Sequence, residues 1–163
     1  MKLSQETLKS ELHYDPATGL FTRARAASTF RKVGEVAGGA DRNGHIRISI
    51  GNRLYSAHRL AWLYVYGIHP SGAIDHINGN RSDNRIANLR DVTLSVNQQN
   101  QRAAQKHNST GLLGVTFNKA RGRFQAQIGL GKDRRYLGLF DTAEAAHAAY
   151  VTAKRALHEG CTI

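Results

Sequence analysis

The stretch AIDHINGNRSDNRIANLR, residues 73–90, decides what fold can be expected in the middle of this chain. It places an acid beside a histidine, at Asp75 and His76, and continues mainly with asparagines and arginines and one glycine, which do not fill a core. Two interpretations compete for it: a solvated loop, or a site that holds a metal ion and a phosphate. The candidates for burial are Ile74, Ile77, Ile86, Leu89 and, just beyond the stretch, Val92.

The composition indicates the kind of partner. The chain has 163 residues, enough for one ordinary domain or two small modules. Its 23 Lys and Arg residues outnumber 12 Asp and Glu residues, which gives a net charge of +11 and favours a polyanionic partner. No apolar run approaches the roughly 20 residues that span a bilayer, and no apolar signal core is present near the start. We therefore expect a nucleic acid as the partner, and no membrane.

Cysteine use limits the possible chemistry. Cys161 is the only cysteine, so an intrachain disulfide and a cysteine-based zinc cluster are both excluded. The default expectation is a reducing, cytoplasmic setting. No sequence feature predicts a small-molecule cofactor, and the oligomeric state is left open.

Alternating side chains predict strands on the N-terminal side of the polar stretch. Residues 19–25, 45–50 and 53–60 alternate apolar with polar positions, and residues 44–58 predict a hairpin with Gly51 and Asn52 at its turn. Residues 56–67 then predict a short helix that begins at Ser56 and ends at Gly67. Its apolar side chains are expected in the core: Leu60, Trp62, Leu63, Tyr64 and Tyr66.

The last fifty residues predict a second, separate pattern. Residues 112–118, 123–130 and 134–140 alternate as three strands. A helix should follow, because Asp141 and Glu144 have capping-box spacing and Gly160 stands at the expected end. Its apolar stripe consists of Ala146, Ala149, Tyr150, Ala153 and Leu157. We expect a three-stranded antiparallel sheet packed on one helix, preceded by a helix-compatible segment and a linker at residues 106–110.

The polar stretch carries the residue types that phosphodiester cleavage needs. Such a reaction requires a nucleophilic water, a base that takes its proton, and positive charge near the leaving oxygen. Histidine is suited to the role of base, and Mg²⁺ prefers oxygen ligands from carboxylates and amides. Asp75 and His76 would point to opposite faces of a strand. Asn97, on the segment that follows, is a candidate for a further oxygen ligand.

Residues 74–101, IDHINGNRSDNRIANLRDVTLSVNQQNQ, resemble the HNH endonucleases of the phage and intron homing type. The resemblance implies a ββα-metal finger, a phage or bacterial host cell, and Mg²⁺ or another divalent cation such as Mn²⁺. It implies Asp75 and Asn97 as metal ligands, with asparagine where many relatives have histidine. It implies His76 as the general base, and Asn88 as the asparagine that braces the loop and orients the histidine.

Other interpretations of these residues stay open. Asp75 could pair with Arg81 or Arg85 in a surface turn, and these two arginines and Arg90 could be solvated charges rather than phosphate contacts. Residues 55–67 also resemble the segment before the catalytic motif in phage members, yet His58 could equally be a packed or hydrogen-bonded histidine. The whole protein could be a non-catalytic DNA-binding regulator that keeps only the scaffold. An RNA-binding protein is a weaker alternative, because the predicted sheet offers few exposed aromatics for base stacking.

Residues 111–160 resemble the plant ethylene-response-factor, or Apetala-type, DNA-binding domain. The resemblance rests on GVTFN (114–118), RFQAQI (123–128), RRYLGLFDTAEAAHAAY (134–150) and LHEG (157–160). Thr116 stands where plant members have a base-contacting arginine, and Arg121 near their conserved tryptophan, so their target sequence is not carried over. The implied DNA contacts are Asn118, Arg121, Arg123, Gln127, Arg134 and Tyr136.

Together these patterns predict an α+β protein in four parts. Residues 1–70 form a strand-rich region with a short helix, residues 71–105 an HNH catalytic finger, residues 106–110 a linker, and residues 111–163 a DNA-binding domain. The expected activity is metal-dependent hydrolysis of DNA.

Overall fold

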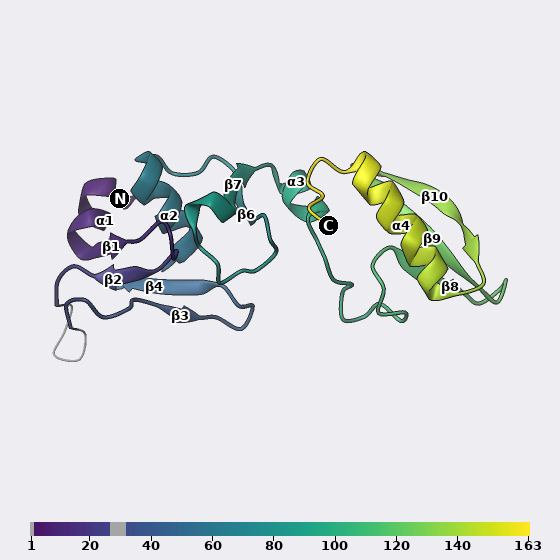
Figure 1. Ribbon diagram of the computed structural model, residues 1–163, viewed down its shortest axis with the longest axis horizontal. Helices are drawn as coiled ribbons and strands as arrows, with labels where there is room; N and C mark the ends of the chain where they lie inside the picture. Colours follow the sequence, from purple (N-terminus) through teal and green to yellow (C-terminus); the bar gives the residue numbers. More distant parts are fainter. Residues whose placement is uncertain (1, 27–31) are drawn as a thin grey trace. The chain divides into compact units, whose positions relative to one another are not determined.

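A computed structural model describes residues 2–26 and 32–163 of the chain. It confirms the α+β class, with four α-helices and several small antiparallel sheets among those residues (Figure 1). The chain divides into two compact units, residues 1–92 and 93–163. Within the described ranges, no helix is long and apolar enough to cross a membrane.

The first unit builds its core from two helices and short strands. Its elements before the polar stretch are α1 (Gln5–Glu11), β1 (Leu12–Tyr14), β2 (Phe21–Arg23), β3 (Gly39–Ala40), β4 (Ile46–Ile50), β5 (Arg53–Ser56) and α2 (Ala57–Tyr66). Strands β1 and β2 pair, and β3, β4 and β5 form a three-stranded antiparallel sheet. One buried cluster joins these elements, and it includes Leu8, Tyr14, Ile48 and Leu60.

The polar stretch folds as a strand, a long loop, a single 3₁₀ turn and a second strand. Strands β6 (Ala73–His76) and β7 (Leu89–Val92) pair antiparallel, and the 3₁₀ turn η1 (Ile86–Asn88) leads directly into β7. Ile74 and Leu89 are buried in the core of the first unit. These two side chains tie the hairpin to that core while its loop stays at the surface.

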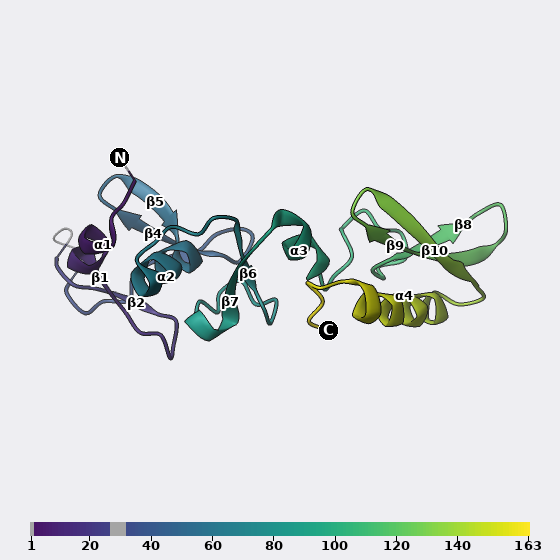
Figure 2. The same ribbon diagram turned by 90° about the horizontal axis from the view of Figure 1, so that it is seen from above.

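The second unit holds α3 (Leu94–Gln99), β8 (Val115–Asn118), β9 (Arg123–Leu130), β10 (Asp133–Phe140) and α4 (Ala143–Leu157). The strands lie in the order β10-β9-β8 and all pair antiparallel. Helix α4 covers one face of this sheet, as Figures 1 and 2 show. Gly114 allows a close approach there, since a Cβ on it would meet the Tyr150 ring at 2.0 Å. The predicted sheet packed on one helix is confirmed.

Several local predictions were wrong. Helix α1 was expected to be part of a strand-rich region; it begins at Ser4, whose hydroxyl accepts a hydrogen bond from the Thr7 amide. Tyr66 is half exposed rather than buried, because it lies at the last turn of α2 and beyond the core stripe. Thr142, and not Asp141, caps α4, because the Thr142 hydroxyl accepts from the Ala145 amide.

The connection between the two modules also differs from the expected linker. The compact units divide after Val92, not at residues 106–110. Asn108 and Thr110 instead make side-chain hydrogen bonds to the Leu112 and Val115 carbonyls. The helix-compatible segment is helical only over Leu94–Gln99. Its far end packs within the second unit, where Gly160 lies against the Val96 carbonyl.

Candidate active site and nucleic-acid interface

The end of β6 holds two neighbouring buried polar side chains. Asp75 and His76 are each 5% exposed, although the residues that follow them at 78–80 are exposed. In the strand register Asp75 lies opposite Arg90, and His76 lies opposite Leu89. A carboxylate and an imidazole on consecutive strand positions point to opposite faces, so each meets a different environment.

Asp75 is held by an ion pair. The Nε of Arg90 donates to Oδ2 of Asp75 at 2.9 Å, and Nη2 of Arg90 lies 2.7 Å from the same oxygen. The sequence suggested Arg81 or Arg85 as the ion-pair partner of Asp75. In the structure the partner is Arg90 instead. A single carboxylate of this kind, with amide oxygen, is the donor chemistry that Mg²⁺ takes. The residues therefore fit a hard divalent ion in donor type, and Arg90 is a competitor for the same oxygen.

His76 is oriented by Asn84, a residue that the sequence did not single out. Nε2 of His76 lies 3.3 Å from Oδ1 of Asn84, and Asn84 is 2% exposed. The Asn84 amide nitrogen donates to the Ser82 carbonyl, which can only accept, so the amide oxygen must face the histidine. Nε2 then carries the proton, and the lone pair lies on Nδ1. Burial lowers the pKa of His76, so the neutral ring is favoured.

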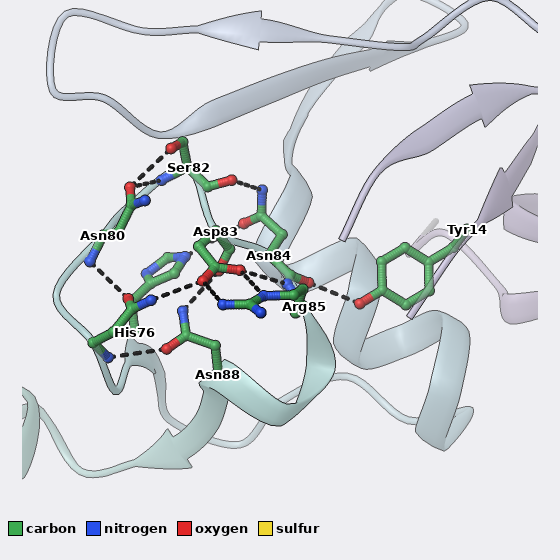
Figure 3. A network of polar contacts seen from close by, with 9 residues as sticks. Tyr14, His76, Asn80, Ser82, Asp83, Asn84, Arg85 and Asn88 are labelled. Atoms are coloured by element: carbon green, nitrogen blue, oxygen red, sulfur yellow. Dashed lines mark hydrogen bonds and ion pairs between the residues drawn. The ribbon is translucent and has the colours of Figure 1, made fainter. Parts of the chain in front are cut away.

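Asn88 spans the loop from the other side. Its Oδ1 accepts a hydrogen bond of 2.9 Å from the Asn78 amide, and its Nδ2 donates one of 2.8 Å to the Asp83 carbonyl (Figure 3). Both ends of the side chain are thus engaged with backbone five and ten residues away. In the described geometry Asn88 ties the loop together, whereas the contact with the imidazole comes from Asn84.

Further contacts inside the loop complete this network. Asp83 accepts hydrogen bonds from Arg85 and from the Asn78 side chain, and the Arg85 bond is the main reason why the pKa of Asp83 falls to about 2. The Tyr14 hydroxyl donates to the Asn84 carbonyl at 2.7 Å (Figure 3). The backbone of Gly19 packs closely against the loop at Arg85. Its φ is +75°, and a Cβ on it would meet the Arg85 amide nitrogen at 2.4 Å. The loop is fixed both internally and against the core.

The arginines expected at phosphates have unequal surroundings. Arg85 is bound by Asp83 and Arg90 by Asp75, although both keep part of their surface exposed. Arg81 is exposed and donates to the Asn43 carbonyl at 3.1 Å. Their contact with phosphate stays a prediction. Asn97 lies on α3 in the second unit, and its role as a metal ligand likewise stays a prediction of the resemblance.

Two further histidines come close to His76. His45 precedes β4 and His58 lies in the first turn of α2, and the ring centroids of His58 and His76 are 5.2 Å apart. Burial lowers the pKa of His45 and that of His58, the latter to about 3. The sequence could not place His45 here, because it lies 31 positions before His76 and no motif links the two.

Five of the six candidate DNA contacts share one face of the C-terminal sheet. The register pairs Asn118 with Arg123, and Gln127 with Tyr136, and it sets Arg134 opposite Gly129. The alternate positions, including Val115, Ala126 and Ile128, are buried on the side of α4. Arg121 stands in the turn between β8 and β9, where its amide donates to the Asn118 side chain.

The exposed face is polar and largely open. Arg134 and Tyr136 are exposed, and Gln127 is partly exposed. Arg123 makes an ion pair of 2.8 Å with Asp141, whose side chain is 83% exposed. A pair so open to water contributes little, so Arg123 can leave it at small cost.

A comparison with known protein families finds a match over the segment that contains Asp75 and His76. Residues 55–99 match the HNH endonuclease family, so the chain carries an HNH domain over α2, β6, β7 and α3. This match supports the ββα-metal fold and suggests a nuclease that acts on nucleic acid. It does not extend into residues 111–160. No curated protein and no solved structure matches the chain.

Proposed function

We propose that this protein is a metal-dependent DNA endonuclease of the homing type that hydrolyses phosphodiester bonds in double-stranded DNA. The observation that carries the proposal is the pair Asp75 and His76, buried at the end of β6 within the segment that matches the HNH family. The working environment would be the cytoplasm of a phage-infected or other bacterial cell.

His76 is proposed as the general base. Its neutral ring and the lone pair on Nδ1 are the properties needed to take a proton from water. Asn84 positions this ring through Nε2, and Asn88 holds the loop that carries Asn84. The activated water would attack the phosphorus in line with the departing 3′ oxygen.

A divalent cation, Mg²⁺ or Mn²⁺, would supply positive charge at the departing oxygen. Asp75, from its buried place on β6, and Asn97, on the resemblance, are the residues proposed to hold it. Arg90 already engages Asp75, so its guanidinium would have to share the carboxylate or turn toward a phosphate.

The C-terminal sheet is proposed as the part that reads DNA sequence. Asn118, Arg123, Gln127, Arg134 and Tyr136 present side-chain donors and acceptors on one face, and such groups can reach base edges in a major groove. Arg121 is proposed to contact DNA from the adjoining turn. The likeness of this part to the Apetala-type domain belongs to the same proposal.

A non-catalytic DNA-binding regulator is the second candidate. The observation in its favour is the Asp75–Arg90 ion pair, which occupies the carboxylate that a metal would need. Under this alternative Arg90 would keep Asp75 paired whatever metal is supplied.

A metal-dependence assay separates the two candidates. Supercoiled plasmid is incubated with the protein in Mg²⁺, in Mn²⁺ and in EDTA. We expect cleavage in either metal and none in EDTA, and we expect Asp75→Asn, which keeps the side chain's size but removes its charge, to lose it. Glu6→Gln removes an exposed carboxylate on α1 and serves as the matched control. Absence of cleavage by the wild-type protein in both metals would favour the regulator.

A further inference from the structure

Three imidazoles from separate parts of the first unit converge on one point. His45 comes from the turn before β4, His58 from the start of α2 and His76 from the end of β6. One ring nitrogen from each lies within 4.8 Å of the others. The ring centroids are 5.4 Å apart for His45 and His58, and 6.0 Å apart for His45 and His76.

We propose that His45, His58 and His76 form a binding site for a divalent transition-metal ion of the Zn²⁺ class, and that an ion bound there inhibits cleavage by occupying His76. The inhibitory half rests on the proposed function; the binding half does not. The ligands are imidazoles only, so this site differs in chemistry from the carboxylate and amide site proposed at Asp75 and Asn97.

The donor set selects the class of metal. Imidazole nitrogen suits Zn²⁺, Cu²⁺ and Ni²⁺, whereas Mg²⁺ takes oxygen ligands and keeps its waters. Three histidines with a fourth position open to water are a known zinc arrangement. Nitrogens bound to one tetrahedral Zn²⁺ would lie about 3.3 Å apart, given Zn–N bonds of about 2.0–2.1 Å. Because the ring nitrogens lie within 4.8 Å of one another, they would approach by at most about 1.5 Å on binding the ion.

An unpartnered atom is the second observation that points to a ligand. Nδ1 of His58 is buried and has no hydrogen-bond partner among the residues that the structure describes. Burying a polar atom without a hydrogen-bond partner is unfavourable, so such an atom calls for an explanation. A metal ion at the centre of the three rings would require only a lone pair from this histidine, and the neutral ring has one.

The surroundings resemble the outer shell of a histidine–metal site. Ligating histidines commonly donate the second ring N–H to a carboxylate or a carbonyl oxygen. Asn84 Oδ1 takes that position at Nε2 of His76, and Asp41 Oδ1 lies 4.0 Å from Nδ1 of His45. The second distance is longer than a hydrogen bond, so Asp41 would have to approach as the rings close.

Charge near the cluster acts in both directions. Arg47, Arg59 and Arg81 lower the pKa of one or more of the three rings, and the same positive field disfavours a metal ion. Asp41, Asp75 and Asp83 act in the opposite sense on His45 and His76. The three aspartates thus offset part of the arginine charge at the cluster, and the imidazole donors decide which cation is preferred.

Binding can be measured without any DNA. The full-length, metal-stripped protein is titrated with Co²⁺, followed by its visible absorption, and with Zn²⁺ by calorimetry; Mg²⁺ over the same concentrations is the comparison metal. We expect one Co²⁺ or Zn²⁺ per chain. We expect the affinity to fall by at least about tenfold in His45→Gln, which removes the partly exposed ligand of the cluster.

Matched variants distinguish loss of the site from loss of an unrelated histidine or from misfolding. His13→Gln removes an exposed histidine on β1 and should bind the metal as the wild type does. His58→Gln should also lose the site; if it fails to fold by circular dichroism, His45→Gln alone decides. Equal affinity of the wild type and His45→Gln for Zn²⁺, or no binding tighter than that of Mg²⁺, would overturn the proposed site.

The inhibitory half needs a cleavage assay in excess Mg²⁺. Equimolar Zn²⁺ should suppress plasmid cutting by the wild-type protein, and should have less effect on His45→Gln relative to that variant's own zinc-free rate. Zinc binding without suppression would overturn the inhibitory half alone. A protein that binds zinc as predicted but never cuts DNA in Mg²⁺ or Mn²⁺ would instead count against the proposed nuclease activity.

Discussion

The loop of residues 77–88 and the outer face of the C-terminal sheet are both polar, but they are built in opposite ways. In the loop, Asn84 and Asn88 are nearly buried, and each side chain is tied to the backbone at short range. On the sheet, Arg134 and Tyr136 extend into solvent. A group that must act on one water needs a fixed position, whereas side chains that read base edges can be ordered by the DNA itself.

This contrast predicts the largest stability effect at Asn88. Asn88→Ala strands the Asn78 amide and the Asp83 carbonyl, and each stranded group costs about 1–3 kcal/mol where water cannot replace the bond. We expect a loss of about 2 kcal/mol or more in the free energy of unfolding of the first unit, together with lower activity. Thermal and urea melts would measure it, with Gln127→Ala on the sheet face as the control that should change stability little. Full stability with no activity would instead assign Asn88 a direct catalytic part.

The next effect concerns DNA recognition and should spare folding. Arg134→Ala or Arg121→Ala should relax preference at particular base pairs, because one good bidentate hydrogen-bonding pair to a base discriminates by about 1–3 kcal/mol. Lys132→Ala, in the turn between β9 and β10, should weaken all sequences alike, because a phosphate contact carries no sequence information. Binding to a randomised DNA library at fixed salt measures both. Unchanged site preference in both arginine variants would make this sheet a packing or partner-binding surface.

The smallest expected effect is at Tyr14, which links the loop to the core. Tyr14→Phe removes one hydrogen bond to the Asn84 carbonyl and should cost about 1 kcal/mol. Burial raises the pKa of Tyr14 to about 12, so the phenol stays protonated in the folded state when it would ionise in the unfolded chain. Its contribution is fully present below about pH 10 and is lost as the pH rises toward 12.

Urea melts between pH 8 and pH 12 measure this dependence. The stability of the wild-type protein should fall more steeply above pH 10 than that of Tyr14→Phe. Equal slopes for the two proteins would show that the Tyr14 hydroxyl is not held in the folded state as described.

The sequence predicted the C-terminal sheet and helix well because their signals are local. Alternation over residues 123–130 and the alanine stripe of α4 each lie within one element. The middle hairpin was expected from the resemblance of residues 74–101, which the HNH family match supports over residues 55–99. Helix α1 was missed because its seven residues contain only one buried side chain, Leu8, which is too little for a periodic pattern.

Parts of the site could not be predicted from the sequence, because they depend on contacts between residues far apart in the chain. Asn84 is one of several loop asparagines, and only its burial beneath Tyr14 distinguishes it. His45 lies beside His76 because side chains of β4, α2 and β6 share one buried core cluster, which no local spacing reveals. The division after Val92 likewise arises from the packing of Val96 and Gln99 against Gly160 at the other end of the second unit.

The packing of residues 96–102 against the C-terminal end affects how the role of the C-terminal sheet can be tested by truncation. The Gln99 side chain of α3 accepts from the Gly160 amide, and just after α3 Gln101 accepts from Lys154 and Arg102 donates to the Thr162 carbonyl. A chain ending near Lys106 would lose all three of these partners. A truncation there would therefore disturb the second unit as well as remove the sheet. Point variants on the sheet face test its part in recognition more cleanly.

The role of His76 as the general base is tested most directly by measuring cleavage and DNA binding on the same samples of wild-type protein and His76→Ala. We expect the wild type to cut plasmid DNA in Mg²⁺ or Mn²⁺ and not in EDTA. We expect His76→Ala to bind the same DNA with nearly unchanged affinity and to cut at least about 100-fold more slowly, because a general base contributes roughly 10²–10⁴-fold. Cleavage by His76→Ala at the wild-type rate would contradict the assignment of His76 as the base.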